Sequence, residues 1–119
     1  MPIEKKFYIT KENTLGKVTA HLHGELDLSV APEFRADLEP YINQSKTTLE
    51  LNFTDLTYID STGIGVIILI LKQRTAIGGT FKITNVPKKI KKLFDITGIS
   101  KHLDIEDSKA QLERKEDVV

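Results

Sequence analysis

The sequence contains no cysteine, and its formal charges cancel. Without a thiol the chain can form no disulfide framework, no thiolate metal site and no cysteine nucleophile, which is compatible with a reducing cytoplasm. Seventeen Lys and Arg residues balance seventeen Asp and Glu residues, so no global electric field attracts nucleic acid or an anionic membrane. Any partner must therefore be recognised by a local surface.

Long hydrophobic runs are missing as well. The densest run, residues 66–71, is far shorter than the roughly 20 residues that span a bilayer, and the first six residues lack the apolar core of a signal peptide. The sequence therefore predicts a cytoplasmic protein with no membrane-spanning segment. Its 119 residues, 39% of them apolar and 29% charged, fit a single domain over 1–119 that buries roughly two-thirds of its unfolded surface.

Several stretches alternate apolar and polar residues, which is typical of half-buried strands. They cover residues 7–10, 18–23, 49–53 and 81–83, and Leu103 with Ile105 predicts a further short strand. Residues 13–16 can turn between the first two. The tail 106–119 is charged and only weakly helical in pattern.

Helical spacing separates these strands. Phe34, Leu38 and Ile42 share one helix face, although Pro40 predicts a kink or an early end because proline removes a helical hydrogen bond. Near the end of the chain, Ile90 and Phe94 lie on an apolar stripe together with Val86 and Leu93, and Gly98 supplies a stop.

Residues 64–71 are ambiguous, because their β-branched side chains favour a strand. Their boundaries favour a helix over 62–77, since Asp60 and Ser61 are cap formers and Gly78-Gly79 can end it. Being apolar on nearly all sides, such a helix must pack across a sheet. The predicted fold is therefore α/β, a mixed four- to five-stranded sheet with helices packed across it.

The stretch Asp60-Ser61-Thr62-Gly63 has two possible explanations. Its side chains can satisfy the unpaired backbone N–H groups at a helix start. Alternatively, Gly63 and Gly65 leave the backbone uncovered, so that an anion or a partner can approach closely. A dinucleotide fingerprint would need a third glycine where Ile68 stands, and no Gly-Lys-Ser/Thr of a P-loop is present.

Other chemistries are poorly supported. His21 and His23 share a strand face, but no other ligand converges on them, so no metal is predicted. A hydrolase built from Ser61, a histidine and Asp27 or Asp60 would need glycine where Ile59 stands. Four lysines between 88 and 92 are interpreted as solvated surface. We predict no catalytic residue, no cofactor and no enzymatic activity.

The motifs resemble the STAS domain of bacterial anti-sigma factor antagonists of the sporulation and general-stress type. The resemblance rests on Gly-Glu-Leu-Asp at 24–27, Tyr-Ile-Asp-Ser-Thr-Gly-Ile-Gly at 58–65 and Leu-Phe-Asp-Ile-Thr-Gly-Ile at 93–99. In that family the serine of the middle motif is phosphorylated by a partner that is both kinase and anti-sigma factor. The unphosphorylated protein binds that partner and so frees the sigma factor.

The resemblance implies Ser61 as the phosphorylated residue, an anti-sigma factor serine kinase as partner, and a phosphatase acting on phospho-Ser61. Neither nucleic acid nor a membrane is an expected partner. The family's topology would bring Asp27 and Ser29 to the end of the sheet that holds Ser61, and the expected partner-binding residues are Asp27, Ser29, Asp60, Ser61, Thr62, Gly63 and Gly65. The alternatives are a STAS subunit of another bacterial complex, such as a signalling scaffold or lipid transport, and a nucleotide-binding module.

Overall fold

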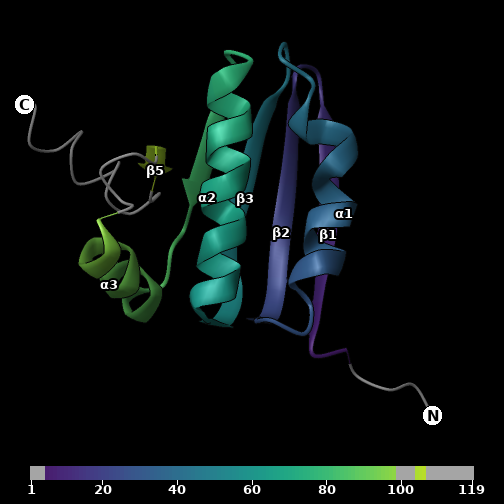
Figure 1. Cartoon of the computed structure of the whole chain (residues 1–119). Helices are drawn as coiled ribbons and strands as arrows, with labels where there is room; N and C mark the ends of the chain where they lie inside the picture. The colour runs from purple at the N-terminus through teal and green to yellow at the C-terminus, as the bar shows by residue number, and fades with distance from the viewer. Residues whose placement is uncertain (1–4, 99–103, 107–119) are drawn as a thin grey trace, which may run out of the picture.

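A five-stranded mixed sheet forms one layer of the molecule (Figure 1). The computed structural model describes residues 5–98 and 104–106. The strands, in sheet order, are β1 (Phe7–Thr14), β2 (Lys17–Leu26), β3 (Thr48–Ile59), β4 (Phe81–Thr84) and β5 (Asp104–Glu106). β1 is antiparallel to β2, and all later neighbours are parallel. The predicted mixed α/β sheet is confirmed.

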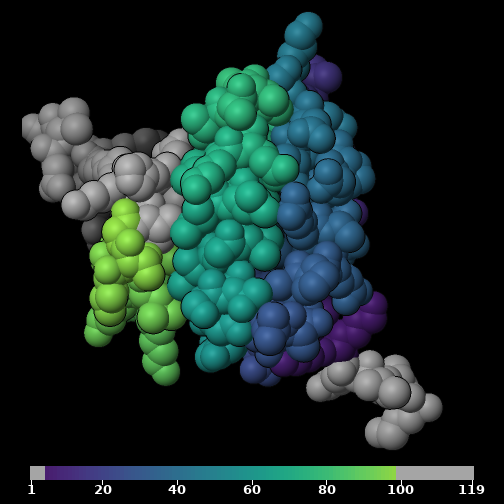
Figure 2. Space-filling model, in the orientation of Figure 1, coloured from purple at the N-terminus to yellow at the C-terminus, as the bar shows by residue number. Residues whose placement is uncertain are grey.

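Three helices connect the parallel strands, as the crossovers between parallel neighbours require. They are α1 (Ala31–Ile42), α2 (Ser61–Ala76) and α3 (Lys88–Thr97). α1 and α2 lie side by side across one face of the sheet, and α3 lies beyond α2 on the β4 side (Figures 1 and 2). The sequence-based prediction of a helix over 62–77 is confirmed within one residue at each end.

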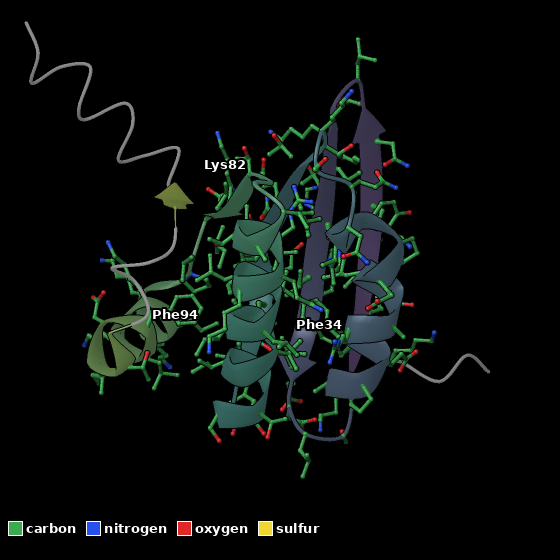
Figure 3. All side chains as sticks on the ribbon, turned by 45° about the horizontal axis from the view of Figure 1, so that its top comes forward. Phe34, Lys82 and Phe94 are labelled. Atoms are coloured by element: carbon green, nitrogen blue, oxygen red, sulfur yellow. The ribbon has the colours of Figure 1, made fainter. Side chains whose placement is uncertain are left out.

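The core lies between the helices and the sheet. Alternate residues of β2 and β3, including Ala20, Leu22 and Leu51, are fully buried against the apolar side chains of the helices. Figure 3 shows Phe34 of α1 and Phe94 of α3 among them. Phe94 meets Phe53 of β3 edge to face, with ring centroids 6.0 Å apart.

The ends of α1 and α3 lie close to Pro40 and Gly98. α1 continues past Pro40 and ends two residues later at Ile42. α3 ends at Gly98, which adopts the left-handed φ of 79° that glycine tolerates. Ile90 and Phe94 are buried, whereas Leu93 is 39% exposed at the edge of the stripe. Leu103 and the tail 107–119 lie outside the described residues.

Arg74 is a buried cation, which the sequence pattern did not reveal. Its side chain, 0% exposed, extends from α2 to the end of α1. The guanidinium donates hydrogen bonds to the carbonyl oxygens of Tyr41, Ile42, Gln44, Thr47 and Thr80. These include carbonyls at the end of α1, where the helix dipole is negative. Arg74 therefore ties α1, α2 and the start of β3 together.

Candidate functional site at the ends of β2 and β3

The carboxyl ends of two parallel strands bring the candidate residues together. Leu26 is the register partner of Ile59, so the loop 27–30 and the start of α2 emerge at the same edge of the sheet. The backbone N–H of Asp60 donates to the Leu26 carbonyl oxygen at 3.2 Å. Asp27 and Ser29 therefore lie at the end of the sheet that holds Ser61, as the family topology implied.

Asp60 uses both carboxylate oxygens to fix this arrangement. Oδ1 accepts the backbone N–H of Gly63 at 2.9 Å, which caps α2. Oδ2 accepts the backbone N–H of Leu28 at 3.1 Å, which anchors the loop after β2. One side chain thus sets the position of the loop relative to the helix.

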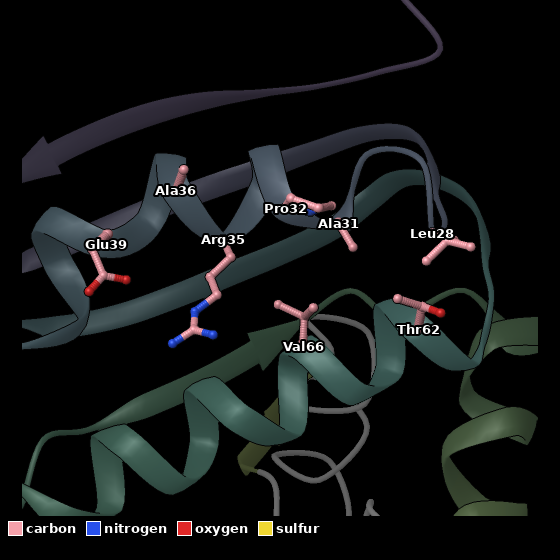
Figure 4. Close-up of a pocket in the computed structure, with 8 residues that line it drawn as sticks. All are labelled: Leu28, Ala31, Pro32, Arg35, Ala36, Glu39, Thr62 and Val66. Atoms are coloured by element: carbon pink, nitrogen blue, oxygen red, sulfur yellow. The ribbon is translucent and has the colours of Figure 1, made fainter.

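Ser61 and Thr62 differ in their surroundings. Ser61 is the exposed first residue of α2, and within the described part of the chain its hydroxyl forms no hydrogen bond. Thr62 is half-buried and faces α1 across a groove (Figure 4). The capping explanation therefore applies to Asp60 and not to Ser61, whose hydroxyl is free to react or to meet a partner.

The two glycines have different environments. Gly63 is buried, and a Cβ there would come within 2.8 Å of both the Ile59 side chain and the Leu26 carbonyl oxygen. The sequence-based interpretation that Gly63 leaves the backbone uncovered is therefore wrong, because close packing of α2 on β2 and β3 requires glycine. Gly65 is exposed, and a Cβ there would meet nothing within 4 Å. Only Gly65 presents open backbone.

Asp27 is held by a residue that the sequence reading did not single out. Its carboxylate forms an ion pair with the Lys6 ammonium and accepts hydrogen bonds from the Ser29 hydroxyl and backbone N–H. The bonds from Lys6 and then Ser29 lower the pKa of the Asp27 carboxyl to about 2. The carboxylate is therefore ionised and oriented at neutral pH.

Gly24 supplies the signal that could have revealed Lys6. Gly24 has a φ of +97°, and a Cβ there would lie 2.0 Å from the Lys6 carbonyl oxygen. That carbonyl accepts the backbone N–H of Glu25 at 3.0 Å. Glycine at the head of the Gly-Glu-Leu-Asp motif thus lets the segment before β1 lie against the end of β2, within reach of Asp27.

The histidines and lysines do not join this site. His23 lies 3.2 Å from Asp55 and stacks on Tyr8, while His21 lies 3.5 Å from Glu12. Over residues 5–98 and 104–106, no three His, Asp or Glu side chains gather as metal ligands would. The four lysines of α3 are exposed. Among the helices described, none has the length and apolarity needed to cross a membrane.

Fold and site together define a class of protein. A model of the STAS domain family matches residues 8–112, which include every candidate residue except Lys6. The chain belongs to the STAS domain family.

Curated relatives narrow the class. An anti-sigma-B factor antagonist of Bacillus subtilis is 35% identical over 88 residues, which are 74% of this chain and 80% of the relative. An anti-sigma-B factor antagonist of Listeria monocytogenes is 26% identical over 102 residues, 86% of this chain and 90% of the relative. These relatives place the chain among the anti-sigma factor antagonists of the family.

Solved structures share the fold. The anti-sigma factor antagonist SpoIIAA in its unphosphorylated form superposes with a TM-score of 0.71 at 24% identity, covering 94% of this chain and 99% of that one. The Bacillus cell fate determinant SpoIIAA in its phosphorylated form gives a TM-score of 0.67 at 25% identity, covering 90% and 98%.

Proposed function

We propose that this antagonist works by partner switching at Ser61. In its unphosphorylated form it binds an anti-sigma factor that is also a serine kinase, and the sigma factor is released. Phosphorylation of Ser61 by that kinase ends the binding, and a phosphatase acting on phospho-Ser61 restores it. The observation that supports this most is the exposed Ser61 hydroxyl, unbonded among the described residues, on a helix that Asp60 already caps.

The chemistry at Ser61 requires little from this chain. Ser61 Oγ forms a bond to the γ-phosphorus of ATP held by the kinase, ADP leaves, and the hydroxyl proton passes to a base of the kinase. The positive end of α2 tolerates the resulting phosphate. We propose that the protein has no catalytic activity of its own, needs no cofactor, and acts in the cytoplasm.

The switch acts on the interface because the phosphate changes what a partner must desolvate. Phosphorylation adds about two negative charges and three acceptor oxygens. In this chain they would stand on the residue that follows Asp60, whose carboxylate caps the same helix start. A partner surface that fits a neutral hydroxyl would then have to bury a dianion without a counter-charge, which costs several kcal/mol.

The proposed partner-binding surface is centred on Ser61. Asp27, Ser29 and Asp60 form its rim on the loop side, and Thr62 and Gly65 extend it along α2. Gly63 is buried and supports this surface indirectly, because its backbone N–H donates the hydrogen bond that holds the Asp60 carboxylate in place.

The test uses a kinase that binds to the protein in a pull-down. An ATP-binding partner is isolated by pull-down with the unphosphorylated protein, purified, and incubated with the wild type, Ser61→Ala and Thr62→Val in the presence of ATP. Mass spectrometry should find phosphate on Ser61 in the wild type and in Thr62→Val, and none in Ser61→Ala. Ser61→Ala should still bind the kinase. Phosphate on Thr62 alone, or on neither hydroxyl, would contradict the proposal.

A further inference from the structure

A groove of about 660 Å³ runs between α1 and the first half of α2. Its walls are mainly apolar and include Leu28, Ala31, Pro32 and Val66 (Figure 4). Its volume lies in the range of about 300–1,000 Å³ that is typical of ligand sites. Leu28 stands at one end, and its side chain is 69% exposed although leucine gains free energy by burial.

One cation projects into this apolar groove. Arg35 extends from α1 towards α2 (Figure 4). Within the described residues its guanidinium forms no hydrogen bond and no ion pair. Glu39, one turn further along α1, does not pair with it. Arginine placed four residues before glutamate is also the less favourable order for helix stability. Helix stability therefore does not account for Arg35.

The groove is continuous with the switch residue. Thr62, the neighbour of Ser61, lines the groove. Leu28, at the same end of the groove, is held by the hydrogen bond from its backbone N–H to Asp60. A kinase that reaches the Ser61 hydroxyl must cover this end of α2, so its surface also meets the mouth of the groove.

We propose that the groove between α1 and α2 is the docking site for a segment of the kinase partner that carries a large apolar side chain and, close to it, a carboxylate. The inference rests on the proposed function. The apolar side chain packs among Leu28, Ala31 and Val66, and the carboxylate forms a bidentate pair with Arg35, the geometry that a guanidinium favours. Arginine is enriched among the few residues that carry most of the affinity of an interface, as are large aromatic side chains that fill a pocket.

The charge contact is tested by binding of the purified kinase to Arg35→Glu. Lys72→Glu is the matched control, because Lys72 is exposed further along α2 and the same change of charge is made outside the groove. Calorimetric titration should show at least tenfold weaker binding for Arg35→Glu and at most a twofold change for Lys72→Glu. Equal thermal midpoints should show that both variants fold. Arg35→Glu binding within twofold of the wild type would overturn the docking site.

The occupant is identified by photo-crosslinking. Benzoylphenylalanine replaces Ala36 in the groove or, as the control, Ala76 at the exposed end of α2. Position 36 should crosslink to one kinase peptide that contains Asp or Glu beside an apolar residue, and position 76 should not. A crosslink from position 36 to a second copy of this chain, or to a peptide without an acidic residue, would overturn the proposal. If the wild type itself does not bind the kinase, the proposed function fails first.

Discussion

At the scale of single residues, neighbours in the Asp-Ser-Thr-Gly motif have separate tasks. Asp60 caps α2 and anchors the loop after β2, whereas the Ser61 hydroxyl forms no hydrogen bond with any described residue. Gly63 is required by packing, and Gly65 is not. A serine without a structural task at the start of a helix can be modified without loss of fold.

Substitutions at Asp60 and at Ser61 should lower the free energy of unfolding by unequal amounts. Asp60→Ala should lower the free energy of unfolding by about 1–2 kcal/mol, because it removes a helix cap and the acceptor of the Leu28 N–H. Ser61→Ala should stay within about 0.5 kcal/mol of the wild type. Urea denaturation measures both. A loss of 1 kcal/mol or more in Ser61→Ala would show that Ser61 shares the cap.

Replacing Gly65 by alanine should change stability and kinase binding in opposite directions. Gly65→Ala should stabilise the protein by up to about 1 kcal/mol, because alanine favours a helix interior and its Cβ meets nothing in the fold. Kinase binding should weaken, because the added methyl group blocks close approach of the partner. Thermal unfolding and calorimetric titration on one preparation test this. Unchanged binding would remove Gly65 from the proposed interface.

The Lys6–Asp27 pair predicts a titration at low pH. The pKa of Asp27 is lowered from 3.8 to about 2, chiefly by the bond from Lys6. A carboxyl whose pKa is lowered on folding stabilises the folded state at pH values above the pKa that it has in the unfolded chain. This contribution to stability is lost as the pH falls through about 2. NMR titration should place the Asp27 midpoint near 2 in the wild type and Lys5→Met, and higher in Lys6→Met. An unchanged midpoint in Lys6→Met would contradict the pairing.

At the scale of the elements, one buried side chain joins two helices. Burial lowers the pKa of the Arg74 guanidinium, and within the described part of the chain the groups that accept its hydrogen bonds are all carbonyl oxygens. Gly79 fits against it, since a Cβ there would lie 2.6 Å from the Arg74 Cζ. The positions of α1 and α2, and with them the groove between the helices, thus depend on a residue at the far end of α2 from Ser61.

Arg74→Met should therefore be costly. It removes the guanidinium donor from five carbonyl oxygens, of which those of Tyr41, Gln44 and Thr80 keep a backbone N–H donor. The free energy of unfolding should fall by about 3 kcal/mol or more. Lys72→Met, two residues away and exposed, should change it by no more than about 0.5 kcal/mol. Guanidinium denaturation compares the two. Equal stability of the two variants would refute this role of Arg74.

At the scale of the whole molecule, the proposed switch changes the surface and leaves the fold intact. Ser61 stands at the edge of the sheet, on an end of α2 whose dipole favours negative charge. The core beneath does not include its side chain. Regulation of this kind requires no conformational change within the domain.

Phosphorylation should accordingly separate stability from binding. The phospho-Ser61 protein should have a free energy of unfolding within about 1 kcal/mol of the unmodified protein, and its affinity for the kinase should be at least tenfold lower. Calorimetry measures both quantities on the same two samples. A large loss of stability on phosphorylation would instead indicate that the switch unfolds part of the domain.

Local pattern was sufficient for much of this molecule. Alternation of apolar residues located the strands, and cap formers with terminal glycines outweighed the strand propensity of residues 64–71. Both signals reflect contacts within a turn or along one strand, so they are visible in the sequence. The motif resemblance indicated the end of the sheet that holds both Asp27 and Ser61.

The remaining features depend on contacts between distant segments. Lys6 reaches Asp27 across 21 positions, and Arg74 reaches Ile42 across 32. Whether Gly63 or Gly65 faces the core, and whether Arg35 faces a groove, depends on how α1 and α2 lie on the sheet. The sequence by itself determined the elements and the chemistry available at the start of α2. Only the tertiary structure decided which side chains are bound there and which are free, because burial and pairing arise when distant segments pack together.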